Sequence, residues 1–352
     1  GSQVQGMGMA AYDSSEEAKK VWDRVDSFCQ KELGFSIIKV VRDNPKEMLV
    51  NGQKISHPKG VLHLTQFTQV ALTVLTMAQT TELRAASLFH SKAMFAGHSL
   101  GEYAALSCFD IMSGEEVVRV VYNRGLTMQN YVPRDENGKS PFGMMVVRPK
   151  IVGWSQKSLE EEVVSLTKAE KDEAIYVVNY NIEGSQYAVT GHLGLLHKLE
   201  EKLLKRQNEL GAKKPACIWV EGVDVPFHSP LLEGGVDAFR KTIEATIGHV
   251  DPELLIDRYI PNLNAVPFSL EKEYVQAIYE QTKSSVLEKV LEDWSVYDHQ
   301  AELLARLILI ELLAYQFASP VRWINTQKAF LTHERLAVDK VIEFGPSPVL
   351  SN

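Results

Sequence analysis

Apolar residues in the first third of the chain recur at the spacing of amphipathic helices. Two adjacent serines precede one such pattern over 16–32, and serine is favoured just before the first turn of a helix. A second pattern over 64–77 is apolar enough to be a core element, and a third follows Ser113 over 115–128. The N-terminal region is therefore predicted to be mainly helical.

The pattern changes near residue 141. Strands are predicted over 142–147, 175–180, 186–190 and 216–220, and helices over 158–167 and 193–210. The order β-α-β-β-α-β is the ferredoxin-like pattern. We therefore expect a ferredoxin-like small subdomain over 140–222, inserted into one larger subdomain formed by 1–139 and 223–352.

The segments on either side of this insert carry both helices and strands. A long helix is predicted over 300–317 and a final strand over 338–344. Upstream of the insert, a short strand over 93–97 leads into a helix over 102–108. These elements predict an α/β fold, in which the large subdomain is α/β-hydrolase-like with a mostly parallel sheet.

Ser99 lies between this short strand and its helix, in the sequence FAGHSLGEYAAL, with Gly97 and Gly101 on either side. In a G-x-S-x-G turn the serine takes a strained backbone conformation, and the glycines leave room for the closely passing backbone. The hydroxyl is then presented above the sheet, and the N–H of Leu100 at the helix N-terminus can donate to an oxyanion. The five residues alone also fit an ordinary helix cap.

A serine hydroxyl is barely acidic at neutral pH, so a nucleophilic serine needs a neighbouring base. Of the ten histidines, His98 adjoins Ser99, but a residue beside the nucleophile on a tight turn usually points elsewhere. His228 follows a strand-like run on a proline-bounded loop, DVPFHSPLL, and is the best candidate. Phe227 would form an apolar wall beside it. Serine and histidine by themselves do not separate a hydrolase from a transferase.

Composition narrows the class of protein. The 352 residues are 45% hydrophobic and 23% charged, and a formal net charge of −8 disfavours nucleic acid as a partner. Cys29, Cys108 and Cys217 fit neither a disulfide framework nor a metal-binding spacing, so a reducing compartment, the cytoplasm, is expected. The apolar run over 303–317 is interrupted by polar residues and is too short to span a bilayer, and no signal peptide is recognisable. No membrane is therefore expected as a partner.

Five motifs in the chain together resemble the malonyl/acyl-CoA:ACP transacylase family, and they occur in the family's order. They are GHSLGEYAAL (97–106), VVYNRGLTMQ (120–129), NYNIEGSQYAVTG (179–191), VDVPFHSPLL (223–232) and QFASPVRW (316–323). Two segments, DPELLIDRYIPNL and ELLAYQFASPVRWI, are most similar to the malonyl/palmitoyl transferase domain of type I fatty acid synthases, of the fungal β-subunit or bacterial single-chain kind. The resemblance covers nearly the whole chain.

The resemblance implies a role for each matched residue. Ser99 is expected to accept the acyl group, and His228 to act as general base and then as general acid. Arg124 is expected to pair with the free carboxylate of a malonyl group, which a planar guanidinium can hold through two hydrogen bonds. Gln316 is expected beside the histidine, which the family orients through a main-chain carbonyl at this place. Asn181 is expected in the polar network around the pocket.

The family also begins with a strand and a GQGSQ turn, whose first glutamine lends its backbone N–H to the oxyanion hole. This sequence starts at Gly1-Ser2-Gln3, so that glutamine would come just before Gly1. We therefore expect the sequence to be a piece of a longer polypeptide. Leu100 is the oxyanion donor that the sequence itself contains.

The implied function is acyl transfer within fatty acid synthesis. Malonyl groups would pass from coenzyme A through a serine ester to the phosphopantetheine of an acyl carrier protein. The likeness to the synthase domain implies that palmitoyl groups would be transferred in the same way. No bound cofactor is expected, because malonyl-CoA and palmitoyl-CoA are substrates. The partners would be the carrier protein and the other synthase domains.

Two alternatives to this function stay open. One is a serine thioesterase or esterase, for which the candidate acids Asp110 and Glu183 carry no motif, and the other is a silent scaffold domain of a synthase.

Overall fold

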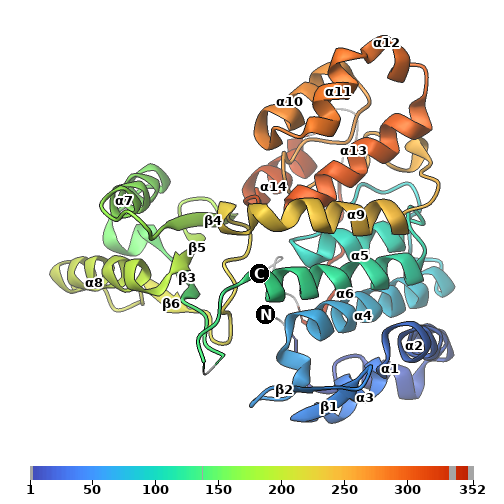
Figure 1. Cartoon of the computed structure of the whole chain (residues 1–352), viewed down its shortest axis with the longest axis horizontal. Coiled ribbons are helices and arrows are strands. Elements are labelled where there is room, and N and C mark those ends of the chain that lie inside the picture. The colour runs from blue at the N-terminus through green and yellow to red at the C-terminus, as the bar shows by residue number, and fades with distance from the viewer. Residues whose placement is uncertain (1–2, 137, 333–337, 348–352) are drawn as a thin grey trace.

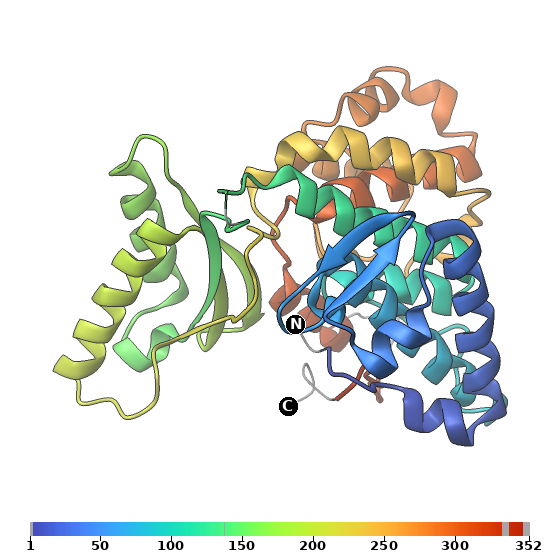
Figure 2. The same ribbon diagram turned by 60° about the horizontal axis from the view of Figure 1, so that its bottom comes forward.

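The chain folds into two subdomains of unequal size. The computed structural model describes residues 3–136, 138–332 and 338–347. The smaller subdomain, at the left of Figure 1, stands apart from the larger, mostly helical one, and the view in Figure 2 shows the same separation. Each subdomain has its own cluster of buried apolar side chains. The expected α/β architecture with two subdomains is confirmed, whereas the residue at which one gives way to the other stays a prediction.

The small subdomain is a four-stranded antiparallel sheet with two helices packed on it (Figure 1). Its strands are β3 (Phe142–Val147), β4 (Ile175–Ile182), β5 (Gln186–His192) and β6 (Cys217–Trp219), and its helices are α7 (Gln156–Lys168) and α8 (Leu193–Glu209). The strand order is β4-β5-β3-β6, with antiparallel neighbours. This is the ferredoxin-like arrangement, and all six elements overlap the predicted ones.

Strand β3 supplies two apolar layers, because successive side chains of a strand point to opposite faces of the sheet. Met145 and Val147 are buried in the core of the small subdomain, whereas Met144 joins Val178 of β4 in a separate small cluster. Phe227, from the large subdomain, packs against this second cluster. The second face of the small sheet is therefore turned toward the large subdomain.

The large subdomain is built mainly of helices. They are α1 (Met9–Ser14), α2 (Glu16–Phe28), α3 (Ile37–Asp43), α4 (Thr65–Ala85), α5 (Leu100–Cys108), α6 (Gly114–Tyr131), α9 (Val236–Thr246), α10 (Lys272–Thr282), α11 (Ser285–Glu292), α12 (Trp294–Tyr297), α13 (Ala301–Gln316) and α14 (Trp323–Thr332). A hairpin of β1 (Glu47–Val50) and β2 (Gln53–Ser56) accompanies them. Short 3₁₀ helices lie at Val61–His63, Pro230–Gly235 and Pro252–Leu254, and a π turn, Cys29–Leu33, extends α2; a further 3₁₀ helix, Pro149–Val152, lies between β3 and α7 of the small subdomain. The helices predicted over 16–32, 64–77, 115–128 and 300–317 correspond to α2, α4, α6 and α13.

The mostly parallel sheet expected in the large subdomain is reduced, among the described residues, to one parallel bridge between Phe95 and Tyr259. Phe95 exchanges two backbone hydrogen bonds of 2.8 and 3.0 Å with the residues flanking Tyr259. The next backbone donor along, Asn262 N–H, donates to the carboxylate of Glu102 (3.1 Å) instead of to a strand carbonyl, so the ladder ends there. The strand predicted over 338–344 is also not formed in the described part of the chain.

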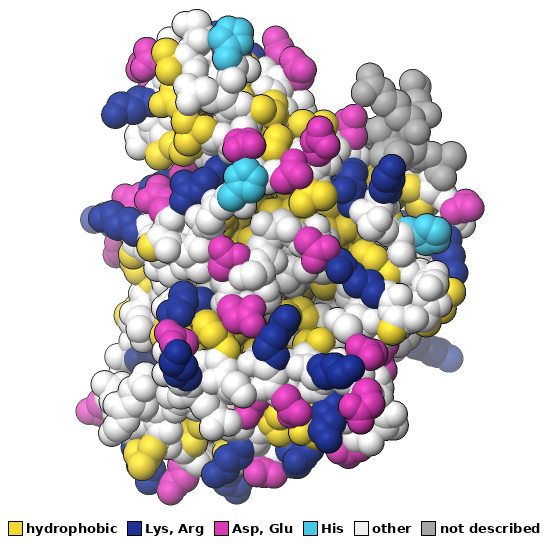
Figure 3. All heavy atoms as spheres, turned by 90° about the vertical axis from the view of Figure 1, so that its right-hand side faces the viewer, with side chains coloured by type: hydrophobic (Ala, Val, Ile, Leu, Met, Phe, Trp, Pro, Cys, Tyr) yellow, Lys and Arg dark blue, Asp and Glu magenta, His cyan; other side chains and the backbone are white. Residues whose placement is uncertain are grey.

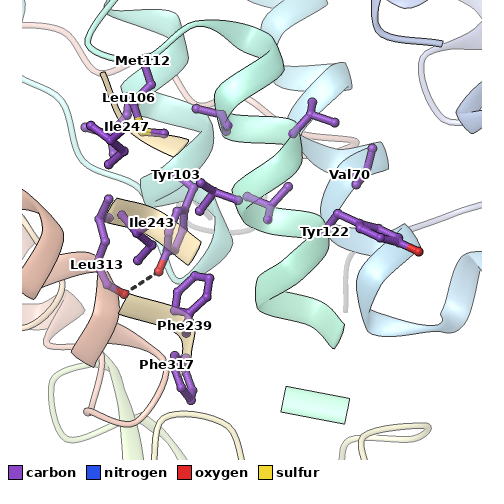
Figure 4. Packing of buried hydrophobic residues seen from close by; sticks show 14 of the residues in the cluster. Val70, Tyr103, Leu106, Met112, Tyr122, Phe239, Ile243, Ile247, Leu313 and Phe317 are labelled. Carbon is purple, nitrogen blue, oxygen red and sulfur yellow. Dashed lines mark hydrogen bonds between the residues drawn. The ribbon is translucent and has the colours of Figure 1, made fainter. Parts of the chain in front are cut away.

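Helix α5, which follows Ser99, is fixed between α9 and α13. Tyr103 is fully buried, and its hydroxyl donates to Leu313 O of α13 at 2.7 Å (Figure 4). The centre of its ring lies 6.4 Å from the ring centre of Phe239 on α9. The Phe239 ring in turn meets the ring of Phe317 edge-on, with 5.5 Å between the ring centres. These contacts prevent the start of α5 from shifting relative to the end of α13.

Helices α4 and α6 cross at a glycine. A Cβ at Gly125 would lie 2.4 Å from the Cα of Gln66 and 2.6 Å from its backbone N, and helix backbone cannot move aside as a flexible side chain can. The absence of a side chain at Gly125 thus permits the close crossing. The crossing in turn brings its neighbour Arg124 beside α4, which carries Gln69.

Main-chain hydrogen bonds join the two subdomains. Tyr180 N–H on β4 donates to Val321 O (3.0 Å), and Val321 N–H donates to Val178 O (2.8 Å). Val321 lies between α13 and α14, so one edge of the small sheet continues onto the large subdomain. On another side, Lys59 forms a salt bridge of 3.2 Å with Glu221.

The surface carries charges of both signs. On the face in Figure 3, lysine and arginine side chains alternate with aspartate and glutamate, and neither sign forms one continuous field. None of the helices in the described ranges has the length and apolar character needed to cross a membrane.

Candidate active site

Ser99 lies on a strained turn at the start of α5. Its φ and ψ are 54° and −111°, a region that residues with a Cβ rarely adopt and that costs on the order of 1–3 kcal/mol. Gly97 is required at this turn, because a Cβ there would lie 1.9 Å from the carbonyl carbon of Gly101. Since α5 begins at Leu100, the Leu100 N–H has no acceptor within the helix and is available to a developing oxyanion.

Asn262 braces the turn. Its Oδ1 accepts a hydrogen bond from Ser99 N–H (2.7 Å), and its Nδ2 donates to Gly97 O (2.6 Å). Asn262 is 1% exposed, so both bonds form out of contact with water, where hydrogen bonds are strongest. They hold the backbone that leads into the strained residue, on its N-terminal side.

His228 contacts the Ser99 hydroxyl across 129 positions of sequence, with Nε2 2.6 Å from Oγ. Its other ring nitrogen, Nδ1, lies 3.0 Å from Gln316 O and 3.2 Å from Ser319 O. Because carbonyl oxygens only accept, Nδ1 carries the proton and Nε2 is the free acceptor that faces the serine. Burial, and next the positive charge of Arg124, lower the pKa of His228 to about 3. The imidazole is therefore neutral, in its basic form, near pH 7.

Arg124 is a buried cation beside this pair. It is 3% exposed, and its Nη2 lies 3.5 Å from Ser99 Oγ. Its two short hydrogen bonds go to neutral amide oxygens, Nη1 to Gln69 Oε1 and Nη2 to Gln316 Oε1, both at 2.8 Å. The guanidinium carbon lies 5.1 Å from the ring centre of Tyr103. Within the described ranges no acidic side chain forms an ion pair with Arg124, and its Nε has no partner there.

Gln316 connects the serine, the arginine and a buried carboxyl group. Its Nε2 donates to Ser99 O (2.6 Å) and to Glu102 Oε2 (2.7 Å), while its Oε1 accepts from Arg124. Burial raises the pKa of Glu102 to about 7, against the opposing effects of its hydrogen bonds, the strongest from Tyr259, and of the nearby Arg124 charge. Gln316 is thus both the carbonyl neighbour of the histidine and the side-chain partner of the arginine.

Asn181 and Phe227 lie at the border with the small subdomain. Asn181, on β4, pairs through Oδ1 with His98 Nε2 at 2.9 Å, and therefore borders the serine turn through the residue before Ser99. The ring of His98 meets Trp323 edge-on at 5.5 Å. Phe227 is half-buried between the cores of both subdomains. The two candidate acids of the hydrolase alternative lie elsewhere, Asp110 with Arg84 (2.8 Å) and Glu183 with Lys328 (3.0 Å).

Four residues of the site were not predicted from the sequence. They are Gln69, Glu102, Tyr259 and Asn262. Glu102 had a signal, because it is a charged residue in the otherwise apolar and small-residue segment after Ser99. Asn262 and Gln69 had none, since their partners lie 163 and 55 residues away in the sequence.

The three cysteine thiols are the other potential nucleophiles of the chain. Cys29, Cys108 and Cys217 are free and buried. Burial raises the pKa of each thiol, to about 11 for Cys108 and Cys217, so the reactive thiolate is scarce at neutral pH. In the part of the chain that the structure describes, no three His, Cys, Asp or Glu side chains are grouped as a metal site.

Residues 1–209 match the acyl transferase domain family. The chain is 35% identical over 427 aligned residues to Fatty acid synthase 2 of Mycosarcoma maydis, covering 99% of this chain and 11% of that protein. It is 34% identical over 381 residues to Fatty acid synthase subunit beta of Saccharomyces cerevisiae, covering 85% of this chain and 18% of that protein. The chain therefore spans less than a fifth of the length of either relative.

A similar fold occurs in the crystal structure of an acyl carrier protein S-malonyltransferase from Vibrio cholerae. The two superpose with a TM-score of 0.70 over 100% of this chain and 89% of that one, at 22% identity, a likeness of fold. The family match is stronger, because it extends over more than half of the chain and includes the serine turn. The chain belongs to the acyl transferase domain family.

Proposed function

We propose that this chain transfers malonyl groups from coenzyme A to the phosphopantetheine thiol of an acyl carrier protein, through an ester on Ser99. The observation that carries the proposal is the buried guanidinium of Arg124 beside the serine–histidine pair. A buried charge without a counter-charge is costly, so this site favours an anionic ligand. In a malonyl thioester one methylene separates the carboxylate from the reacting carbonyl, which suits the 3.5 Å between Arg124 Nη2 and Ser99 Oγ.

In the first half-reaction, Ser99 Oγ attacks the thioester carbonyl while its proton passes to Nε2 of His228. The oxyanion that forms is stabilised by the free N–H of Leu100 at the start of α5. The carbon–sulfur bond then breaks, and His228 returns the proton to the departing coenzyme A thiolate. The main-chain carbonyls of Gln316 and Ser319 hold the ring through Nδ1–H and stabilise the imidazolium that exists between these steps.

In the second half-reaction, a phosphopantetheine thiol gives its proton to His228 and attacks the ester carbonyl. The bond to Ser99 Oγ breaks, the serine recovers its proton from the imidazolium, and an acyl thioester leaves. A thioester is consumed and a thioester is made, so the overall exchange is freely reversible and needs no bound cofactor. Its direction follows the supply of acyl donors and acceptors.

The relatives support the choice of substrates and partners. Two are fatty acid synthases, and the structural neighbour from Vibrio cholerae is named for malonyl transfer on acyl carrier protein. We extend the proposal to palmitoyl groups, because half-buried Phe227 offers an apolar wall beside the base. The carrier domain and the other domains of a synthase are the proposed partners.

Two further points belong to the same proposal. The three unpaired, buried cysteines support a reducing compartment, the cytoplasm. The two separate apolar cores support the division of the chain into a large subdomain, residues 1–139 and 223–352, and a small subdomain, residues 140–222.

The direct test is to incubate the full-length protein with malonyl-CoA or palmitoyl-CoA and examine the Ser99 peptide by mass spectrometry. The expected result is an acyl ester on Ser99 that disappears when a carrier protein is added, and that Ser99→Ala never forms. Rapid release of free malonate or fatty acid without an acceptor would instead indicate a thioesterase or esterase. No ester under any condition would indicate a silent scaffold domain.

A further inference from the structure

Glu102 is a buried carboxyl group that the acyl-transfer steps do not use. It lies in the first turn of α5, three residues after Ser99, and is 1% exposed. Three donors converge on its carboxylate. Oε1 accepts from the Tyr259 hydroxyl and from Asn262 N–H (3.1 Å), and Oε2 accepts from Gln316 Nε2 (2.7 Å). Three converging donors fit an ionised carboxylate, which only accepts hydrogen bonds.

These contacts fix which way the side-chain amide of Gln316 faces. Its Nε2 has two acceptors, Glu102 Oε2 and Ser99 O, on the same side. The amide oxygen is left on the opposite side, where it accepts from Arg124 Nη2 at 2.8 Å. If the amide turned over, its NH₂ group would face the guanidinium and its oxygen would face the carboxylate. Both pairs are repulsive, and both are out of reach of water.

Gln316 also separates the negative charge of Glu102 from the positive charge of Arg124. The short partners of the guanidinium are the neutral amide oxygens of Gln69 and Gln316, and a direct ion pair with Glu102 is absent among the described contacts. The guanidinium is therefore held in position while its charge stays available to a further anion. A carboxylate directly against it would have occupied the place of a substrate.

We propose that Glu102 is a positioning residue for substrate selection. Through Gln316 it holds the guanidinium of Arg124 in the orientation that receives the carboxylate of a malonyl group. The inference rests on the proposed function, because it concerns how the same site distinguishes malonyl from uncharged acyl groups.

The test compares Glu102→Gln with Glu311→Gln in the full-length protein. In Glu102→Gln the new amide would offer one acceptor oxygen to three donors, so either one donor stays unpaired or the amide of Gln316 turns. Glu311 is the matched control, because it is also fully buried and hydrogen-bonded, to Arg240 (2.6 Å) and Ser284 (2.6 Å), and lies on the helix that ends at Gln316.

The measured quantities are the KM and kcat for ester formation on Ser99, with malonyl-CoA and with palmitoyl-CoA. Glu102→Gln is expected to raise the KM for malonyl-CoA roughly tenfold and to change that for palmitoyl-CoA by less than about threefold. Glu311→Gln is expected to leave the ratio of the two KM values unchanged. An equal change for both substrates in Glu102→Gln, or the same shift of the ratio in Glu311→Gln, would overturn the inference. Absence of any Ser99 ester in the unaltered protein would instead refute the proposed function.

If Glu102→Gln does not fold, the unaltered protein provides a second test. Burial raises the pKa of Glu102 to about 7, so the carboxyl group gains a proton below that pH. Its O–H is then a hydrogen-bond donor, like the NH₂ group of Gln316 that it faces. The other ionisable groups that face Glu102 keep their protons over this pH range. Burial raises the pKa of three tyrosines, Tyr103, Tyr259 and Tyr274. The guanidinium of Arg124 remains charged. The KM for malonyl-CoA should rise between pH 8 and pH 6 while that for palmitoyl-CoA stays level. A constant ratio over this range would overturn the inference.

Discussion

The main-chain carbonyl of Gln316 lies 3.0 Å from Nδ1 of His228, at the position that a carboxylate occupies in a Ser-His-Asp triad. A carboxylate would favour the charged imidazolium and raise the pKa of the ring. Two carbonyls orient the ring with less effect on its charge, so burial and the nearby guanidinium dominate its protonation. The imidazole is thereby kept neutral, which is the form that can accept a proton from the serine.

The acid limb of the reaction should consequently lie far below the usual range of histidine. Since the pKa of His228 is lowered to about 3, the base is lost only as pH falls toward that value, whereas an ordinary histidine is lost near pH 6.5. With saturating palmitoyl-CoA, the rate of Ser99 ester formation in quenched-flow experiments should be level between pH 8 and pH 5. Circular dichroism at each pH controls for unfolding, and a midpoint near 6.5 would contradict the expectation.

Removing the guanidinium should affect only substrates with a free carboxylate. Arg124→Ala is expected to reduce kcat/KM for malonyl-CoA about 10- to 100-fold, which corresponds to the loss of one or two charge-assisted hydrogen bonds. Palmitoyl-CoA should be affected by less than about threefold. Arg124→Lys keeps the charge but cannot hold a carboxylate through a planar fork, so it should recover only part of the malonyl activity. Equal losses for both substrates would show that Arg124 supports the serine and does not select the substrate.

Removing the brace at the serine turn should reduce the rate for every substrate alike. Asn262→Ala eliminates the bonds to Ser99 N and Gly97 O, so the strained backbone loses its support and the nucleophile is less well placed. We expect kcat to fall roughly tenfold with malonyl-CoA and with palmitoyl-CoA, with little change in KM. Asn264→Ala is the control, because its side chain accepts from Val266 N–H and does not contact the turn. A change in substrate preference in Asn262→Ala would contradict this role.

The glycine at the crossing of α4 and α6 should be required for stability. Gly125→Ala would place a methyl group 2.4 Å from the Cα of Gln66, so the two helices must move apart, at a cost of about 1–3 kcal/mol. Chemical denaturation should register this loss, and the KM for malonyl-CoA should rise because Arg124 moves away from Gln69. Gly248→Ala meets its nearest atom at 3.5 Å and should leave both quantities unchanged. An unaltered free energy of unfolding in Gly125→Ala would show that the crossing can relax.

The parts of the fold that were predictable from sequence are those set by local periodicity. The apolar spacing of α2, α6 and α13 and the strand–helix order of the small subdomain are local signals, and these elements form where predicted. The mostly parallel sheet was not predictable in this way, because backbone donors such as Asn262 N–H bond to a side chain distant in sequence. The same reason applies to the site. A motif can point to Ser99 and His228, but the roles of Gln69 and Asn262 depend on contacts that only the folded chain brings together.

The bonds between β4 and Val321 have a mechanical consequence. Val321 lies only two residues after Ser319. The main-chain carbonyl of Ser319 is one of the two that hold the ring of His228. If the small subdomain turned away from the large one, the load would pass through those two main-chain bonds directly onto the support of the imidazole. The ferredoxin-like subdomain is thus connected to the imidazole of His228 through only two residues of main chain, so a force on its sheet would change the angle of that ring.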